Sequence, residues 1–280
     1  KIIFPNHKQF DIIKKLIPEF EKKSGISITI HQFSQSELKK TQILNFKRPR
    51  GQYDIIAYTP FWKIEYVKNN YLESLTPYIL NMQLSNPDYD IEDIAPYFLE
   101  SIGKVGGKFG YLEGPGSSIY GIPCGIETNI LSYRKDIFKK HGFTPPETME
   151  NLIDIAEELL VLEDNMYPFT TRGKPNHHLT HAWLSYSEPY NGKIMDTNWN
   201  PTINSQQNIE AFKQLKKVMS LSSLDSRNYT FYDAAMAFLK GEAIMFLDSL
   251  VIVDQINSNP LSQIKGKVGY TVIPKSIKNA

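Results

Sequence analysis

Two spacings of apolar residues alternate along the first part of the chain. Runs in which apolar residues alternate with polar ones, or follow one another, predict strands at residues 1–4, 26–30 and 53–58. Apolar residues at every third or fourth position predict helices at residues 10–23, 37–46 and 61–68. Such strand–helix repeats indicate a parallel sheet covered by helices, in which ligands gather at the carboxyl ends of the strands. Those ends lead here into residues 5–8 and 59–62.

A second region of the same kind follows a glycine-rich stretch at residues 103–116. It contains predicted helices at residues 137–141, 149–163, 179–186, 206–221 and 232–239. Predicted strands lie at residues 167–171, 242–247 and 267–273. No internal repeat, low-complexity segment or flexible linker separates the two regions, so two intertwined lobes fit the pattern better than two domains in series.

Composition narrows the class of protein. No apolar run in the 280 residues approaches the roughly 20 residues that a membrane-spanning helix needs. The chain begins at Lys1 directly in a strand-like run, as a mature protein does after its leader is removed. The 31 basic and 30 acidic residues are mixed, which argues against a nucleic-acid binder and points to a neutral ligand. The 16 Tyr, 15 Phe and 3 Trp residues suit a carbohydrate site, where rings stack on the ligand.

Four stretches, spread over nearly the whole chain, carry a resemblance to a known family. They are residues 54–56 with Trp62 and 71–76, residues 120–123 with Glu127 and 133–136, residues 237–245, and residues 266–274. In this order they resemble the family 1 solute-binding proteins of ABC-type importers. The resemblance implies an α/β, periplasmic-binding-protein-like (class II) clamp of two lobes, each a mostly parallel sheet flanked by helices. It also implies a binding protein that is not an enzyme, and we expect no cofactor.

The resemblance divides the chain between the lobes. The first lobe is expected to comprise residues 1–128 and 267–280, and the second residues 129–266, with hinges near 127–130 and 265–269. In the family further strands and helices follow, so the C-terminal part is expected to be missing after Ala280. We expect a monomer, in the periplasm or at the cell surface, that delivers its ligand to the permease subunits of the importer. A lipid anchor would belong to a segment outside this chain.

Within this family the chain most resembles the branch that binds mannitol- or sorbitol-like polyols. The similar positions are residues 171–175, 192–201, Asp248, and Asn259 and Pro260 before 266–269. The chain departs from that branch at residues 176–180, which replace a Gly-Trp-Gly-Glu-Asn-like run. It also lacks the Gly-x-Trp that many oligosaccharide binders carry after a strand like 242–247. A small sugar or sugar alcohol is therefore expected as the ligand.

The candidate site residues are those that can hydrogen-bond hydroxyl groups or stack on a sugar. Glu127 comes first, because the resemblance places it at the crossover between the lobes. Arg172, in a loop bounded by Gly and Pro, can donate two parallel hydrogen bonds to a ligand or form an ion pair within the second lobe. Asp248 is either a ligand contact or a structural cap, and if buried it needs partners. The other candidates are Phe61, Trp62, Tyr58, Thr128, Asn129, Trp199, Asn6, His7, Tyr232 and Asp233.

Three histidines and the one cysteine are candidates for other chemistry. His177 and His181 are four residues apart, which on a helix places both rings on one face at metal-binding distance. No Glu stands inside the pair as in zinc proteases, and no Cys or carboxylate flanks it closely. We therefore expect no metal site there, and a cleft contact or a plain helix start for these two residues and His178. Cys124 lacks the local motif of a nucleophile.

Two alternatives to a transport protein stay open from the sequence. A glycosidase needs two carboxylates at a fixed separation across the scissile bond, and Glu127 is the only candidate that arises. A sensory ectodomain would use the same clamp, and only segments flanking this chain distinguish it.

Overall fold

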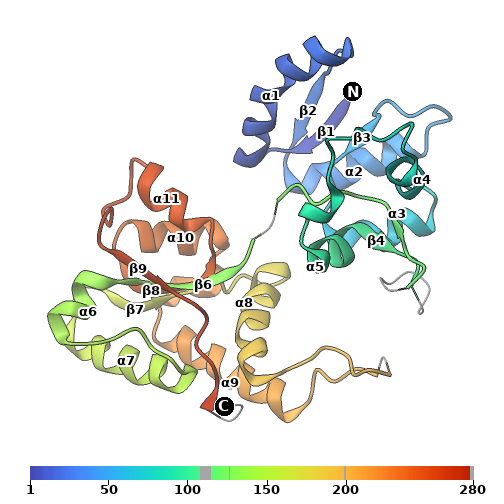
Figure 1. Ribbon diagram of the computed structural model, residues 1–280. Helices are drawn as coiled ribbons and strands as arrows, with labels where there is room; N and C mark the ends of the chain where they lie inside the picture. Colours follow the sequence, from blue (N-terminus) through green and yellow to red (C-terminus); the bar gives the residue numbers. More distant parts are fainter. Residues whose placement is uncertain (108–114, 126, 199, 278–280) are drawn as a thin grey trace. The chain divides into compact units, whose positions relative to one another are not determined.

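The chain divides into two units, Lys1–Ile126 and Glu127–Ala280. The computed structural model describes residues 1–107, 115–125, 127–198 and 200–277 (Figure 1). None of the helices in these ranges has both the length and the apolar character needed to cross a membrane.

The first unit is built on a small parallel sheet. Strand β1 (Ile2–Pro5) lies in the centre and pairs in parallel with β2 (Ile30–Phe33) and β3 (Ile55–Ile56). The helices are α1 (Lys8–Ser24), α2 (Gln35–Phe46), α3 (Pro60–Lys68), α4 (Thr76–Leu80) and α5 (Pro96–Phe98), with a 3-10 turn at Ile91–Asp93 and a π turn at Leu99–Gly103. A two-stranded ribbon, β4 (Lys104–Val105) and β5 (Ser118–Ile119), completes the described part.

Two of the three predicted strands of this sheet differ from the observed ones. The strand predicted at residues 26–30 begins only at Ile30, because Ile30 is the residue that pairs with the start of β1 at Ile2. The buried strand predicted at 53–58 is reduced to β3, and the Ile55 side chain is 55% exposed. Among the described strands, β3 pairs only with β1. It therefore lies at the edge of the sheet, where its other side has no neighbouring strand.

The second unit is larger and is built on a four-stranded sheet. The strands are β6 (Asn129–Arg134), β7 (Tyr167–Thr170), β8 (Ala243–Ser249) and β9 (Val268–Thr271), in the order β7-β8-β6-β9. The helices are α6 (Lys135–His141), α7 (Met149–Leu162), α8 (His177–Ser187), α9 (Gln206–Ser220), α10 (Phe231–Leu239) and α11 (Ile252–Ser258). Short 3-10 turns lie at Glu188–Tyr190 and Leu224–Asn228.

This sheet is mixed, whereas a mostly parallel one was expected. Strands β7 and β8 are parallel, but β6 runs antiparallel to both β8 and β9. Strand β6 is the first strand of this unit, directly after Glu127, and it runs opposite in direction to the strands that follow. Mixed sheets of this kind remain covered by helices on both faces.

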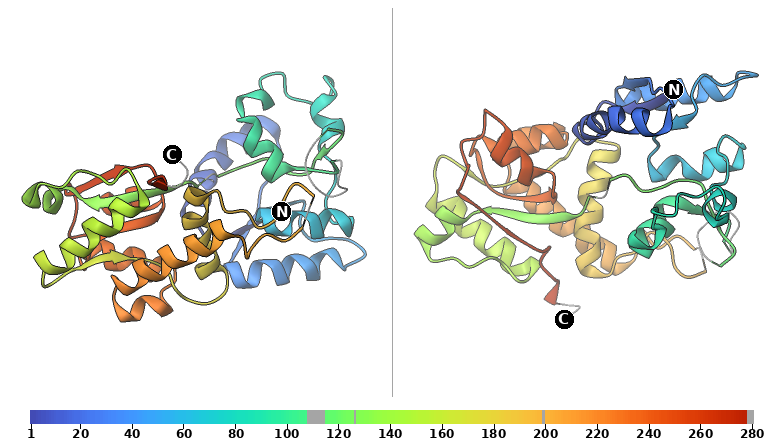
Figure 2. Two further views of the ribbon diagram at one scale, coloured as in Figure 1. Left: turned by 90° about the horizontal axis from the view of Figure 1, so that it is seen from below. Right: turned by 45° about the horizontal axis from the view of Figure 1, so that its top comes forward.

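Helices cover both faces of the second sheet, α10 and α11 on one side and α7 and α9 on the other (Figures 1 and 2). From Met245 to Leu247, successive side chains of β8 enter different cores, as the pleat of a strand requires. Met245 and Leu247 belong to the core that the helices α7, α8 and α9 complete, and Phe246 to the core beneath α10 and α11. Both layers are fully buried, which makes β8 the centre of this unit.

Residues 267–277 are hydrogen-bonded within the second unit, whereas the resemblance assigned residues 267–280 to the first lobe. Strand β9 pairs with β6, with Thr271 opposite Leu131 and Val268 opposite Arg134. Beyond the strand, the Lys275 carbonyl accepts a hydrogen bond of 2.8 Å from the amide of Met149 at the start of α7. These backbone hydrogen bonds attach the described C-terminal segment to the second unit alone.

Asn208 provides a test of how a loop of the second unit is held. Its amide is fully buried and donates to the carbonyls of Lys193 (2.7 Å) and Thr202 (2.9 Å), and its oxygen accepts from the Ser187 hydroxyl at 2.8 Å. Asn208→Ala leaves these partners unpaired, so we expect a loss of about 2–3 kcal/mol in the free energy of unfolding. Urea denaturation measures this change in the free energy of unfolding, and Asn257→Ala on the exposed face of α11 is the control. Equal stabilities for the two variants would contradict this account.

Candidate functional site

Polar side chains meet at one edge of the second sheet because of the way its strands pair. In the parallel pair β7–β8, Thr170 lies opposite Phe246, so each residue of β7 is opposite the residue 76 positions later. Continued for two residues, the same register places Arg172 opposite Asp248. Strand β6 runs the other way, with Asn129 opposite Ser249, which brings the amino end of β6 to the carboxyl ends of β7 and β8.

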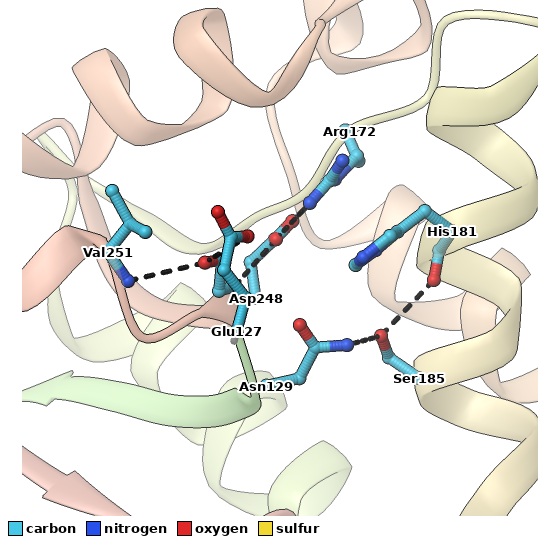
Figure 3. A network of polar contacts seen from close by, with 8 residues as sticks. Glu127, Asn129, Arg172, His181, Ser185, Asp248 and Val251 are labelled. Atoms are coloured by element: carbon cyan, nitrogen blue, oxygen red, sulfur yellow. Dashed lines mark hydrogen bonds and ion pairs between the residues drawn. The ribbon is translucent and has the colours of Figure 1, made fainter. Parts of the chain in front are cut away.

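Arg172 and Asp248 form a buried ion pair at this edge (Figure 3). The Arg172 Nε donates to Asp248 Oδ2 at 2.7 Å, and a terminal guanidinium nitrogen donates to Asp248 Oδ1. The two residues are only 6% and 2% exposed, and the guanidinium carbon lies 5.2 Å from the centre of the Phe231 ring. This is the ion pair that the sequence offered as the alternative for Arg172, and it gives Asp248 the partner that its burial requires.

Glu127 is tied to the same edge through Ser249. The Ser249 hydroxyl donates to Glu127 Oε2 at 2.9 Å and accepts the amide of Val251 at 3.2 Å (Figure 3). The Ser249 amide in turn donates to Asp248 Oδ1 at 2.6 Å, and the amide of Leu250 donates to the carbonyl of Thr128 at 2.8 Å. The Glu127 carboxylate itself is exposed, so its remaining lone pairs are open to a further donor.

Asn129 and His181 form the other side of this polar edge (Figure 3). The Asn129 amide donates to Ser185 Oγ at 2.6 Å, and that hydroxyl donates to the His181 carbonyl at 3.2 Å. The His181 Nδ1 is buried and has no hydrogen-bond partner within the described part of the chain. Burial and the Arg172 guanidinium lower the pKa of His181, while the carboxylates of Asp248 and Glu127 act in the opposite direction.

The other two histidines lie at the start of helix α8. The rings of His177 and His178 are 3.9 Å apart between centroids, and burial lowers the pKa of each, with Arg172 adding to the effect. Across the residues with described structure, no group of three or more His, Cys, Asp or Glu side chains is placed to hold a metal ion.

Three predicted residues of the second half have other surroundings. Asp233 completes a capping box at the start of α10, where its carboxylate accepts from the amide (2.8 Å) and the hydroxyl (2.7 Å) of Thr230. These hydrogen bonds lower the pKa of Asp233. Tyr232 is 66% exposed beside it. Trp199 lies outside the described residues.

The predicted residues of the first unit lie beyond the carboxyl ends of its strands. Asn6 and His7 follow β1, and Tyr58, Phe61 and Trp62 follow β3, which runs parallel to β1. Phe61 is 89% exposed, and the Trp62 ring packs against Tyr66 with the Lys39 amine 5.8 Å from its centre. Burial raises the pKa of Tyr58 to about 12, and its hydroxyl has no partner among the residues described. The first sheet therefore presents aromatic side chains where the second presents charged ones.

A family model matches this chain over nearly its whole length. The model describes bacterial extracellular solute-binding proteins and matches residues 5–279. The chain belongs to this family. Family membership explains the two α/β units and the polar strand ends, since ligands of open α/β sheets bind outside the carboxyl ends of strands.

Relatives and solved structures of this family agree with the assignment. An erythritol/L-threitol-binding protein of Mycolicibacterium smegmatis is 26% identical over 56% of this chain and 33% of its own length. A mannitol-binding protein of Pseudomonas aeruginosa is 20% identical over 68% of this chain and 42% of its own. A solute-binding protein of Agrobacterium radiobacter, solved in complex with ribitol, has a TM-score of 0.81 and 23% identity, covering 99% of this chain and 66% of that one. The chain thus spans less than half the length of these two relatives and about two thirds of the solved structure.

Sequence reasoning gave no site role to Ser249 or Ser185 and interpreted His181 only as a helix start or cleft contact. The replaced run at residues 176–180 pointed to this region, because it marks where the chain departs from the polyol branch. The two serines carried no signal, since their roles depend on the strand register and on the approach of α8 to β6.

The buried ion pair gives a stability prediction. Arg172→Met leaves the Asp248 carboxylate buried without its partner, and we expect a loss of about 3–5 kcal/mol in the free energy of unfolding. The double variant with Asp248→Leu removes both charges and should recover a large part of that loss. Lys217→Met, which breaks the exposed pair with Glu157, is the control and should cost less than about 1 kcal/mol. Urea denaturation of the four proteins checks this, and a single variant no less stable than the control would disprove it.

Proposed function

We propose that this chain is the ligand-binding part of an ABC-importer solute-binding protein that captures a sugar alcohol or small sugar. The observation that carries the proposal is the polar edge of the second sheet, formed by Glu127, Asn129, Arg172, His181 and Asp248. Its one cationic side chain is paired with Asp248, which leaves the exposed Glu127 carboxylate as an acceptor for ligand hydroxyl groups. Such an edge suits a neutral, polyhydroxylated ligand.

The family relatives support a polyol in particular. Two relatives are named for binding erythritol, L-threitol or mannitol, and the Agrobacterium radiobacter protein was solved with ribitol. All four compounds are acyclic polyols. A solved maltose complex of a Thermotoga maritima protein, with 21% identity and a TM-score of 0.79, shares the fold as well. We propose a small ligand over a long glycan, because extended glycans need several stacking rings and the chain has three tryptophans.

Under this proposal the ligand is held from both units. Glu127 and Asn129 accept from and donate to its hydroxyl groups, and Trp62, Phe61 and Tyr58 of the first unit supply ring faces. The chain passes from one unit to the other at Ile126–Glu127, and we propose that the hinge includes this connection. The protein would act as a monomer outside the cytoplasmic membrane and pass its ligand to a permease.

One variant from each unit tests the site. Glu127→Gln and Trp62→Ala should each weaken polyol binding about ten- to a hundredfold, because each removes a hydrogen-bond acceptor or a stacking surface from a closed site. Glu158→Gln, on the exposed face of α7, should leave the affinity unchanged. Calorimetry with erythritol, ribitol, mannitol and maltose measures these changes. Parent-like affinity in both site variants would refute the site, and release of a new product would indicate the enzyme alternative.

Closure on the ligand gives a second test. If only the closed form contacts the ligand from both units, saturating ligand must shift the population toward that form. Small-angle X-ray scattering should then show a smaller radius of gyration with ribitol than without it. The Trp62→Ala variant, which loses contacts from one unit, should need more ribitol for the same decrease. An unchanged radius at a ribitol concentration that saturates calorimetric binding would contradict closure.

A further inference from the structure

His181 carries a buried polar atom that has no hydrogen-bond partner in the described part of the second unit. Its Nδ1 is shielded from solvent and lacks a hydrogen-bond partner among the described residues, although polar groups surround it. A buried nitrogen or oxygen atom without a partner is destabilising, because it has lost its hydrogen bonds to water and gained none in return. Among the unpartnered buried atoms of the described residues, the Nδ1 of His181 is the one beside Arg172, Asp248 and Glu127, where a ligand could supply the partner.

The groups that face His181 come from every element around it. Arg172 follows β7, Asp248 lies in β8, and Glu127 precedes β6, while His177 lies one turn earlier on α8. Asn129 reaches the same helix through Ser185 (Figure 3). The guanidinium of Arg172 opposes protonation of the imidazole, the two carboxylates favour it, and burial tips the balance toward the neutral form.

The neutral ring restricts which ligand atom can serve as the partner. A neutral imidazole has one donor and one acceptor nitrogen, so it matches a hydroxyl group, which can both accept and donate. Since Asp248 already holds the Arg172 guanidinium through two of its nitrogens, little charge remains to attract an anion. A hydroxyl group is the partner that fits.

We propose that the imidazole of His181 contacts the ligand through a hydrogen bond from a ligand hydroxyl group to Nδ1, and that only the neutral ring makes this contact. The inference rests on the proposed function and adds to it a specificity-determining residue and a pH dependence. Protonation removes the acceptor at Nδ1, so a falling pH must weaken binding. Because the pKa of His181 is lowered from its usual value of about 6.5, the weakening begins below that pH.

Two substitutions at this position separate the hydrogen bond from the charge. His181→Asn places an amide at about the position of Nδ1 and does not titrate, so its ribitol affinity should stay within about threefold of the parent at pH 7.5 and lose its decline at low pH. His181→Leu removes the acceptor and should bind ribitol about ten- to a hundredfold more weakly at pH 7.5. The parent should lose up to tenfold in affinity per pH unit once the ring protonates.

The measurement is calorimetric titration of ribitol and erythritol from about pH 5 to about pH 8 on the parent and both variants. His141→Asn is the matched control, since His141 is also a partly buried histidine, at the end of α6, with Glu163 as its partner at 2.7 Å. It should keep the parental affinity and pH profile. Thermal unfolding of each variant without ligand identifies any loss of folded protein.

The outcomes distinguish this inference from the proposed function. If the parent binds neither polyol nor sugar, the proposed function fails and the inference fails with it. If the parent binds and His181→Leu binds equally well, only the inference is overturned. It is overturned also if the decline at low pH persists in His181→Asn, because His177 and His178, whose pKa values burial also lowers, would then be its source.

Discussion

The parallel register between β7 and β8 is the constraint on which the rest of the candidate site depends. It places Arg172 opposite Asp248, and both are buried there, so neither charge is tolerated without the other. The paired Asp248 accepts the Ser249 amide, and Ser249 in turn holds Glu127. One strand register thus fixes, by successive hydrogen bonds, the position of the carboxylate at the entry to the second unit. A shift of the register by one residue would separate all of these partners.

The ion pair between Arg172 and Asp248 also determines which hydrogen-bonding groups at this edge are free to contact a ligand. The guanidinium, a strong group for anion recognition, is occupied by a carboxylate, while the exposed Glu127 and the unsatisfied His181 nitrogen keep hydrogen-bonding capacity. Groups that are already held in place lose little conformational entropy when a ligand binds. The edge therefore combines a rigid base with a few open hydrogen-bond acceptors, as the proposed polyol ligand requires.

Periodicity of the sequence predicted most helices well and some strands poorly, for physical reasons. Helices α7 and α9 follow from apolar residues at helical spacing with capping residues Thr148 and Ser205, which are local features. Strand β6 was not predicted as a strand, and the pairing of β9 with β6 was not predicted either, because both depend on pairing between distant residues. Arg172 and Asp248 were each found as candidates. Their pairing was not, since the 76-residue offset is a property of the assembled sheet.

The direction of β6 connects the site with the passage of the chain between the units. In an all-parallel sheet the amino end of β6 would lie at the edge opposite the carboxyl ends of β7 and β8. Because β6 is antiparallel to β8, Glu127, Thr128 and Asn129 lie at the same edge as Arg172 and Asp248. These three residues are also the first of the second unit. The polar edge of the second sheet therefore lies at the segment through which the second unit is attached to the first.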